Sequence, residues 1–447
     1  MRCRFRVLFV LLFCVFLIAS VGCVPSAGET VADLDISHQS SSVIDAEPII
    51  DAGRGLSAGT PPTGYTPLPL PEPTPEPTTF NARLAVVGDL MAHESQINHA
   101  HNRATNSYSF TSCFEDIKPY LEDADYTIGN LETTLSGEAA RYTGYPVFNT
   151  PDAYAEAIKW AGFDMLTTAN NHSNDRGEAG IVRTLEVLDS LGIDHVGTYA
   201  TEEDQARTFI KEINGIRFAF LSYTYSTNGI PLTRGKPFLV NMLDEDLMRR
   251  QIEQARQDVA EVIVVLPHMG NEYEETPAHR CVTLARKLCE YGADVIMASH
   301  PHVLQPTEFI EVQDSDGKTR TCFITYSMGN FLSGQRTKPR DVGAVFYLDF
   351  EKIVDEDGNH VRLTHASFAP TWVQFYDSGW NTRIRILPVF DVLTDINAGH
   401  DLGLLASDVN RLREVHRETT RKMLGAEVPT SEMKAIYTLY WGRRVES

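Results

Sequence analysis

The feature that most constrains this chain is a series of short apolar runs, each of which ends in polar residues capable of chemistry. The runs are LAVVGD, DYTIGN, DMLTTANN, EVIVVLPH, DVIMASHPH and CFITYSMGN. Between them lie the helical patterns PDAYAEAIKWAG, AGIVRTLEVLDSLG, DEDLMRRQIEQARQDVAE and PAHRCVTLARKLCEYG. Such alternation predicts a layered α/β domain. Because ligands of open α/β sheets bind beyond the carboxyl ends of the strands, the polar ends predict one site.

Oxygen donors close the first two runs. Asp89 follows Gly88 at the end of the first run, and Asn130 and Glu132 follow the second. An Asn and a Glu two positions apart offer a neutral and an anionic oxygen to a hard or borderline cation. Taken singly, each also fits an ordinary turn, because Asp and Asn are common turn residues. We therefore interpret them as metal ligands only together with the histidines that follow.

Histidines close three later runs. Asn171 and His172 end the third run, and amides and imidazoles are costly to bury unpaired. His268 ends the fourth, while His300 and His302 would point the same way from an extended segment. A lone histidine is more often a core residue, but imidazole is the commonest neutral ligand of Zn, Mn or Fe. Together these residues predict a transition-metal site that activates water and polarises a scissile group.

The N-terminal segment predicts export. In residues 1–23, arginines precede an apolar run that is shorter than the roughly 20 residues of a spanning helix, as in a secretion signal. Ser20-Val21-Gly22-Cys23 resembles the lipobox of bacterial lipoproteins, so we expect acylation of Cys23, with ordinary cleavage or an uncleaved anchor as alternatives. Residues 24–79 are rich in Pro, Ser and Thr and predict a disordered linker. The chain is therefore expected outside the cytoplasm, anchored to the cell membrane.

The net charge bears on the possible partners of this chain, and the cysteines bear on its possible disulfides. The formal net charge of -21 over 447 residues excludes a nucleic-acid partner held by phosphate contacts, which require clustered Lys and Arg. Cys281 and Cys289 lie on one helical stripe about 12 Å apart, too far for a bridge, and are interpreted as core residues. A disulfide between Cys113 and Cys322 fits an oxidising compartment, although the sequence does not require it.

The motifs as a set resemble a known family. GDLM, GNLET, YPVFNTP, ANNHSNDRG, HMGNEYEETP, SHPHVLQP and YSMGNF occur in the order seen in poly-γ-glutamate capsule biosynthesis proteins of the CapA type, over residues 82–345. That family looks like a branch of the calcineurin-like metallophosphoesterases. The resemblance implies an α/β (α+β) fold, a four-layer sandwich of two mixed sheets flanked by helices in residues 80–345. Residues 346–447 are expected to add β-strands that complete the domain and a terminal helix.

The resemblance also implies residue roles. It makes metal ligands of Asp89, Asn171, His268, His300 and His302, for one or two divalent ions such as Mn, Zn or Fe. His172 matches the residue that stabilises the transition state or protonates the leaving group. Glu132 is expected to be the bridging carboxylate, with Asn130 nearby.

Three positions complicate the match. Phosphoesterases carry a histidine where this chain has Met91, so one metal would lack a ligand unless His93 replaces it. Glu272 and Asn330 fall inside family motifs and are additional candidates without an assigned role.

The resemblance implies a metal-dependent hydrolase or transferase that acts on a cell-envelope polymer, with γ-linked polyglutamate as the substrate class. A first alternative is a non-catalytic component of a capsule polymer synthesis or export complex, with membrane proteins as partners. A second is a phosphoesterase of small molecules.

Overall fold

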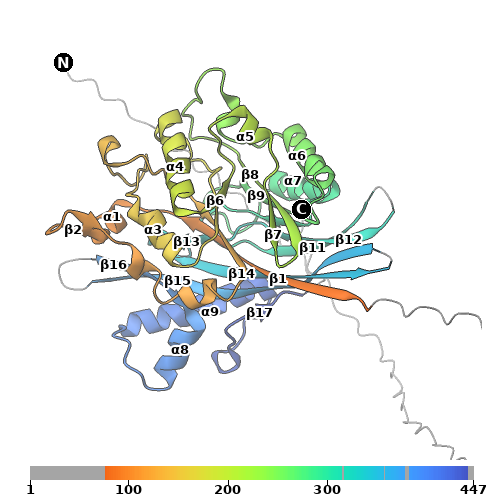
Figure 1. Cartoon of the computed structure of the whole chain (residues 1–447). Helices are drawn as coiled ribbons and strands as arrows, with labels where there is room; N and C mark the ends of the chain where they lie inside the picture. The colour runs from red at the N-terminus through yellow and green to blue at the C-terminus, as the bar shows by residue number, and fades with distance from the viewer. Residues whose placement is uncertain (1–75, 315–316, 357, 378–381, 441–447) are drawn as a thin grey trace, which may run out of the picture. The chain divides into compact units, whose positions relative to one another are not determined.

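The structure is a computed structural model that describes residues 76–314, 317–356, 358–377 and 382–440. The predicted signal and lipobox, and nearly all of the predicted linker, lie outside these ranges. The described residues form two mixed β-sheets that pack face to face, with helices on the outer faces (Figure 1). The predicted α/β sandwich is therefore confirmed.

The first sheet has the strand order β16-β15-β14-β1-β4-β5-β6, with β13 beside β1 and β17 beside β15. Its strands β1, β4, β5 and β6 are parallel, because helices connect them, whereas β14, β15 and β16 form antiparallel hairpins. The strands are β1 (Thr78–Leu90), β4 (Tyr126–Leu131), β5 (Met165–Thr167), β6 (Asp194–Val196), β13 (Asn330–Leu332), β14 (Val342–Asp355), β15 (Gly358–Asp377), β16 (Thr382–Pro388) and β17 (Tyr437–Thr438).

The second sheet has the order β11-β12-β10-β9-β8-β7, with parallel central strands. The strands are β7 (Ile210–Ile213), β8 (Ile216–Thr224), β9 (Val262–His268), β10 (Val295–Met297), β11 (Thr307–Gln313) and β12 (Thr319–Thr325). β8 was not among the six predicted runs, although IRFAFLSYT is almost wholly buried. A separate small hairpin pairs β2 (His101–Asn102) with β3 (Ser107–Tyr108).

Helices cover the outer faces of both sheets. On the first sheet lie α1 (Glu94–Ala100), α2 (Lys118–Leu121), α3 (Ala153–Trp160) and α4 (Gly177–Leu191), and on the second lie α6 (Glu245–Gln257) and α7 (His279–Glu290). The short α5 (Glu202–Ala206) precedes β7, while α8 (Val389–Asn397) and α9 (Ala406–Leu424) contact β15. Within the described ranges, no helix has the length and apolar character needed to cross a membrane.

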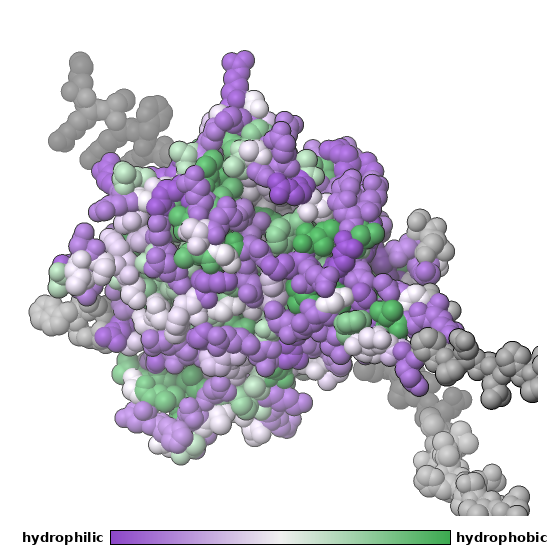
Figure 2. Space-filling model, viewed as in Figure 1, coloured by the Kyte–Doolittle hydropathy of each residue, from purple (hydrophilic) through white to green (hydrophobic). Residues whose placement is uncertain are grey.

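The main core lies between the sheets, where alternate side chains of facing strands interdigitate. Phe218 and Phe220 on β8 meet Phe350 on β14 and Tyr126 on β4, with ring centroids 5.1 to 5.7 Å apart. The surface is mainly hydrophilic on the face seen in Figure 2, with smaller apolar groups at several places, one of them in the region of α8. This distribution is expected, because most apolar residues of this strongly acidic chain are buried between the sheets and under the helices.

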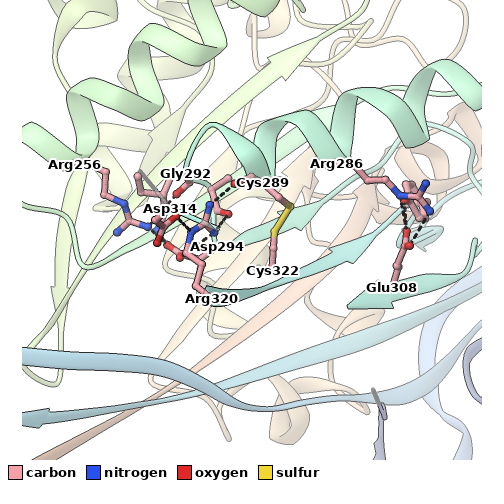
Figure 3. The surroundings of a disulfide bond; sticks show 12 residues. Arg256, Arg286, Cys289, Gly292, Asp294, Glu308, Asp314, Arg320 and Cys322 are labelled. Atoms are coloured by element: carbon pink, nitrogen blue, oxygen red, sulfur yellow. Dashed lines mark hydrogen bonds and ion pairs between the residues drawn. A yellow bond between two sulfur atoms is a disulfide. The ribbon is translucent and has the colours of Figure 1, made fainter. Parts of the chain in front are cut away.

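The cysteines depart from the prediction. Cys289 on α7 forms a disulfide with Cys322 on β12 (Figure 3), with a Cα–Cα distance of 6.0 Å, whereas Cys113 and Cys281 are buried and free. Cys281 and Cys289 are both buried in the core, as predicted, but Cys113 as the partner of Cys322 was wrong, because Cys289 takes that place. The reason is that α7 packs directly on the second sheet beside β12, a contact that sequence spacing does not reveal.

Candidate metal centre

Neighbouring strands of the first sheet place three candidate residues side by side. Asp89 on β1 is opposite Asn130 on β4 and opposite Asn330 on β13. The approach of β1 to the turn before β13 is so close that a Cβ on Gly88 would lie 1.9 Å from the carbonyl oxygen of Gly329. Asn130 donates from Nδ2 to Oδ1 of Asp89 (2.8 Å), and both side chains are buried. The two asparagines therefore flank the Asp89 carboxylate.

The second sheet brings His268 to the same place from the end of β9. Its Nε2 lies 2.8 Å from Oδ1 of Asn171, while its Nδ1 lies 2.9 Å from Ser299 Oγ and 3.3 Å from Asn130 Nδ2. Because Nδ1 faces donors, this network assigns the proton to Nε2 in the absence of a cation. Asn171, from the loop after β5, and His268 thus present adjacent ligand atoms.

His300 and His302 reach the site from the loop after β10, not from an extended segment. β10 ends at Met297, and the two histidines have φ angles of 103° and 59°. This left-handed backbone is unfavourable for residues with a Cβ, and such strain is concentrated at functional sites. The predicted extended geometry was therefore wrong. Both histidines are nevertheless buried at the site, with ring centroids 5.9 Å apart.

Two groups of potential ligands result. The atoms within each group lie within 4.8 Å of one another, and the groups are Asp89, Glu132 and His268, and Glu272, His300 and His302. Oε1 of Glu132 is 3.6 Å from Nε2 of His268 and 3.9 Å from Nε2 of His302, so it lies between the groups. His302 Nδ1 is 3.0 Å from Oδ2 of Asp89. Glu272 is thus brought into the site, although its side chain is exposed.

The chemistry of these atoms fits a divalent cation. Both carboxylate oxygens of Glu132 and the Nδ1 of His300 are buried and have no hydrogen-bond partner among the described residues. An unpaired buried carboxylate is costly, and a bound cation would remove that cost. Carboxylate oxygens combined with imidazole nitrogens suit Zn, Mn or Fe. The donor set is therefore suited to divalent metal, while the role of each ligand stays a prediction.

The two carboxylates differ in acidity when no cation is present. Burial alone would raise the pKa of Asp89, but the hydrogen bond and charge of His302 outweigh it and lower the pKa to about 2. Burial, and then repulsion from Asp89, raises the pKa of Glu132 to about 8. The metal-free site thus holds one ionised carboxylate and one that keeps its proton at neutral pH.

The histidines also differ. Burial lowers the pKa of His268 to about 3 and that of His300 to about 2, so both are neutral. Burial opposes the charge on His302 as well, but the charges of Glu132 and Asp89 raise its pKa to about 9. Two imidazoles are therefore already in the neutral form that binds metals, and the third must release a proton to do so.

His172 lies beside this centre in a network of its own. Its Nδ1 donates to Oδ2 of Asp175 (2.8 Å), which also accepts from the backbone N–H of Phe148 (2.6 Å). Nδ2 of Asn228 is 3.5 Å from His172 Nε2, and Oδ1 of Asn228 accepts from Asn171 Nδ2 (3.3 Å). The imidazole is thus oriented by a buried carboxylate, with Nε2 facing the polar network that leads to Asn171.

Sequence reasoning missed two members of this network. Asp175 was not among the candidate residues, although its position three residues after His172 within ANNHSND was a signal for the pair. Asn228 follows β8, outside every motif that the sequence singled out, and has a left-handed φ of 52°. Only the packing of the loop after β8 against the loop after β5 reveals it.

The position that departs from the phosphoesterase pattern is part of the core. Met91 is buried, and its carbonyl accepts from Gln96 Nε2 (2.8 Å) and Tyr154 Oη (3.1 Å). His93 accepts at Nδ1 from the backbone N–H of Gly334 (3.0 Å) and belongs to neither ligand group in the described part of the chain. The structure therefore gives no support to His93 as the replacement ligand.

Comparison with known proteins identifies relatives for most of this region. The model of the family described as "Bacterial capsule synthesis protein PGA_cap" matches residues 83–335. "Capsule biosynthesis protein CapA" of Bacillus anthracis is 30% identical over 275 residues, which cover 59% of this chain and 63% of that protein. "PGA biosynthesis protein CapA" of Bacillus subtilis (strain 168) is 29% identical over 266 residues, covering 58% and 66%. The chain thus matches slightly less than two thirds of the length of these relatives.

The similarity of this chain to solved structures is weaker than its similarity to these relatives. The calcineurin-like phosphoesterase YfkN from Bacillus subtilis has a TM-score of 0.36 at 14% identity, covering 76% of this chain and 99% of that one. The NAD nucleotidase NadN of Haemophilus influenzae has a TM-score of 0.40 at 11% identity, covering 77% and 57%.

Proposed function

Because the chain belongs to the family of bacterial capsule synthesis proteins, PGA_cap, we propose that it is a metal-dependent hydrolase or transferase of the cell envelope. Its substrate class is an acidic polymer, with γ-linked polyglutamate favoured by the names of the relatives, which refer to capsule and PGA biosynthesis. Attachment to the membrane through Cys23 or an N-terminal anchor, and membrane components of a capsule synthesis complex as partners, belong to the same proposal.

The observation that carries this proposal is the buried Glu132 carboxylate, which has no hydrogen-bond partner in the described part of the chain and lies between two groups of histidine and carboxylate donors. In the proposed site Glu132 is shared, Asp89, Asn171 and His268 hold one side, and His300 and His302 hold the other. A divalent cation held there would supply positive charge that polarises the group to be cleaved and makes water more acidic.

The protein's own residues perform the proton transfer. Asp175 accepts from Nδ1 of His172, which fixes the tautomer and the ring plane and leaves Nε2 directed toward the site. A protonated His172 would donate from Nε2 to the leaving group and would be restored by a proton from water. Asn228 supports this orientation, because its amide group contacts the same nitrogen.

Metal binding is the first test. The full chain is titrated with Mn²⁺ and with Zn²⁺ by calorimetry, beside the double variant Asp89→Asn, His302→Ala. We expect binding by the parent chain and its loss in the double variant. Asp123→Asn is the control, because that carboxylate pairs with Arg83 outside the donor groups. Full occupancy in the double variant would overturn the site assignment.

Turnover is the second test. A γ-linked glutamate oligomer is incubated with the Mn²⁺-loaded chain, and new amino groups or transferred products are measured. We expect turnover that His172→Ala reduces by about 100-fold, the usual size of general acid catalysis. No turnover of the oligomer, combined with rapid hydrolysis of an aryl phosphate, would instead assign a phosphoesterase.

A second function has one observation in its favour. Met91 stands in the core where phosphoesterases supply a ligand, and no other histidine joins the donor groups among the described residues. A chain with a weakened centre could serve a capsule synthesis complex as a binding component without catalysis. Capsule formation in a deletion strain complemented with Asp89→Asn would establish this function, whereas loss of the capsule would refute it.

A further inference from the structure

Two loops meet over the histidines of the site. Tyr273 lies in the loop after β9, where its backbone N–H donates to the carbonyl of Pro301 (2.8 Å). Its ring centroid lies 6.0 Å from that of His302, and 40% of the residue remains exposed. Its φ of 68° is rare for a bulky side chain, which costs free energy and indicates a position that the surrounding structure enforces.

Arg340, from the loop between β13 and β14, lies over the ring of this tyrosine. Its guanidinium carbon is 3.3 Å from the Tyr273 ring centroid. The carbonyl of Arg340 accepts from Nδ2 of Asn330 (2.9 Å), whose Oδ1 is 3.0 Å from Nδ1 of His302. The cation is thus connected to the proposed metal centre through both its side chain and its backbone.

The C-terminal helix α9 holds both loops in place. Arg411 on α9 donates from Nε and Nη2 to the carboxylate of Asp341, the residue next to Arg340, at 2.9 and 2.7 Å. Both side chains are buried. Lys338 in the same loop pairs with Glu414, and Lys422 pairs with Glu275 in the loop of Tyr273. The two loops are therefore fixed relative to one another by ion pairs to one helix.

Arg340 itself is left without such a partner. Its neighbours Lys338, Arg411 and Lys422 are all paired with carboxylates, but the described residues offer Arg340 no ion pair, although the chain has a net charge of -21. A guanidinium stacked on an aromatic ring keeps its N–H groups directed outward in one plane, which matches a carboxylate in a bidentate contact. An available planar cation at the edge of a metal site is suited to an anionic substrate.

We propose that Arg340, stacked on Tyr273, is a specificity-determining residue that binds a carboxylate of an acidic peptide chain whose reacting bond lies at the metal centre. This inference rests on the proposed function and assigns part of its substrate recognition. Arg340 lies beyond residue 335, where the match to the family model ends.

The test measures binding of a γ-linked glutamate oligomer to the full chain loaded with Mn²⁺. Loss of a charged hydrogen-bonding group is expected to weaken binding about 10- to 100-fold in Arg340→Gln. Arg340→Lys, which keeps the charge but not the planar fork, should be intermediate. The matched control is Arg336→Gln, because Arg336 lies in the same loop but stacks on Phe375, at 4.5 Å. It should bind as the parent does.

Tyr273→Leu provides a second variant if Arg340→Gln does not fold. Loss of the stacking surface should weaken oligomer binding by about 2- to 5-fold, the size of an exposed cation–π contact. Unchanged oligomer binding by Arg340→Gln would overturn the subsite. A loss of tripolyphosphate binding without a loss of oligomer binding would also overturn it, in favour of a phosphate site.

Mn²⁺ titration of the same variants separates this proposal from the proposed function. Normal Mn²⁺ binding with weakened oligomer binding in Arg340→Gln supports the subsite. Normal Mn²⁺ binding with unchanged oligomer binding refutes the subsite and leaves the metal centre intact. Absence of Mn²⁺ binding by the parent chain would refute the metal centre itself.

Discussion

Replacing Glu132 with Gln should stabilise the protein when metal is absent and destabilise it when metal is present. The substitution keeps the size of the side chain and removes its charge. Both oxygens of Glu132 are buried, with no hydrogen-bond partner among the residues that the structure describes, and the ionised Asp89 lies in the same donor group. In the metal-free chain Glu132 must therefore take up a proton when the chain folds at neutral pH, and Gln removes this cost.

The size of the effect follows from the pKa of Glu132, which burial and Asp89 raise from 4.5 to about 8. A raised pKa in the folded state gives stability that is complete below the unfolded value and is lost as the pH rises toward the folded value. At pH 7 the loss amounts to about 3 kcal/mol, at 1.36 kcal/mol per pKa unit. In EDTA, Glu132→Gln should therefore unfold with a free energy about 3 kcal/mol higher than the parent at pH 7, and equal to it near pH 4.

Urea unfolding, followed by tryptophan fluorescence in EDTA at both pH values, measures this difference. Excess Mn²⁺ should reverse the order, because a ligand that binds only the folded parent adds RT ln(1 + [L]/Kd) to its stability. Glu308→Gln is the control, since Glu308 is equally buried but bonded to Arg286 and Tyr326, and its loss should destabilise in every condition. A metal-free Glu132→Gln chain less stable than the parent at pH 7 would refute the reasoning.

Asp175→Asn should lower turnover of the γ-linked oligomer by about 100-fold, because the charge that orients His172 is lost, while calorimetry should show unchanged Mn²⁺ affinity; loss of Mn²⁺ binding would contradict a role through His172. Arg411→Met should lower the urea unfolding free energy by about 3 kcal/mol, because it leaves Asp341 buried without its charge partner; no change would mean that the pair contributes nothing. Cys322→Ser should cost roughly 3 to 4 kcal/mol, from the 33-residue separation of the disulfide, and should abolish the effect of reductant on thermal unfolding; a variant that still responds to reductant would contradict the pairing.

The strands that end at the site could be predicted because the residues that bury each strand, and the polar residue that follows it, are neighbours in the sequence. Continuous apolar runs such as Val262 to Leu266 must be buried, and the polar residue that follows each run lies where a parallel strand ends. The meeting of Asp89 and His268 in space then follows from the packing of two sheets whose parallel strands end at the same edge. Burial pattern and strand order together therefore account for the predicted convergence.

The remainder depended on contacts between distant segments. The partner of Cys322 is set by the packing of α7 on the second sheet, and the interaction of Asn228 with His172 is set by two loops 56 residues apart. The left-handed backbone at His302 arises from a loop conformation that alternation of side chains cannot describe. Likewise, the sequence predicted only a terminal helix here, although charged residues of α9 pair with the loop of Arg340.

The pairing of β14 with β1 determines the minimum length of a chain that can fold and function. β14 lies antiparallel to β1 along the whole stretch from Thr78 to Val86, and it follows the end of the family match at residue 335. A chain cut at that boundary would keep every candidate site residue yet expose the edge of β1, and an unpaired strand edge invites pairing between molecules and aggregation. The unit that can be moved between proteins therefore extends through β14, β15 and α9, beyond the segment that the family model matches.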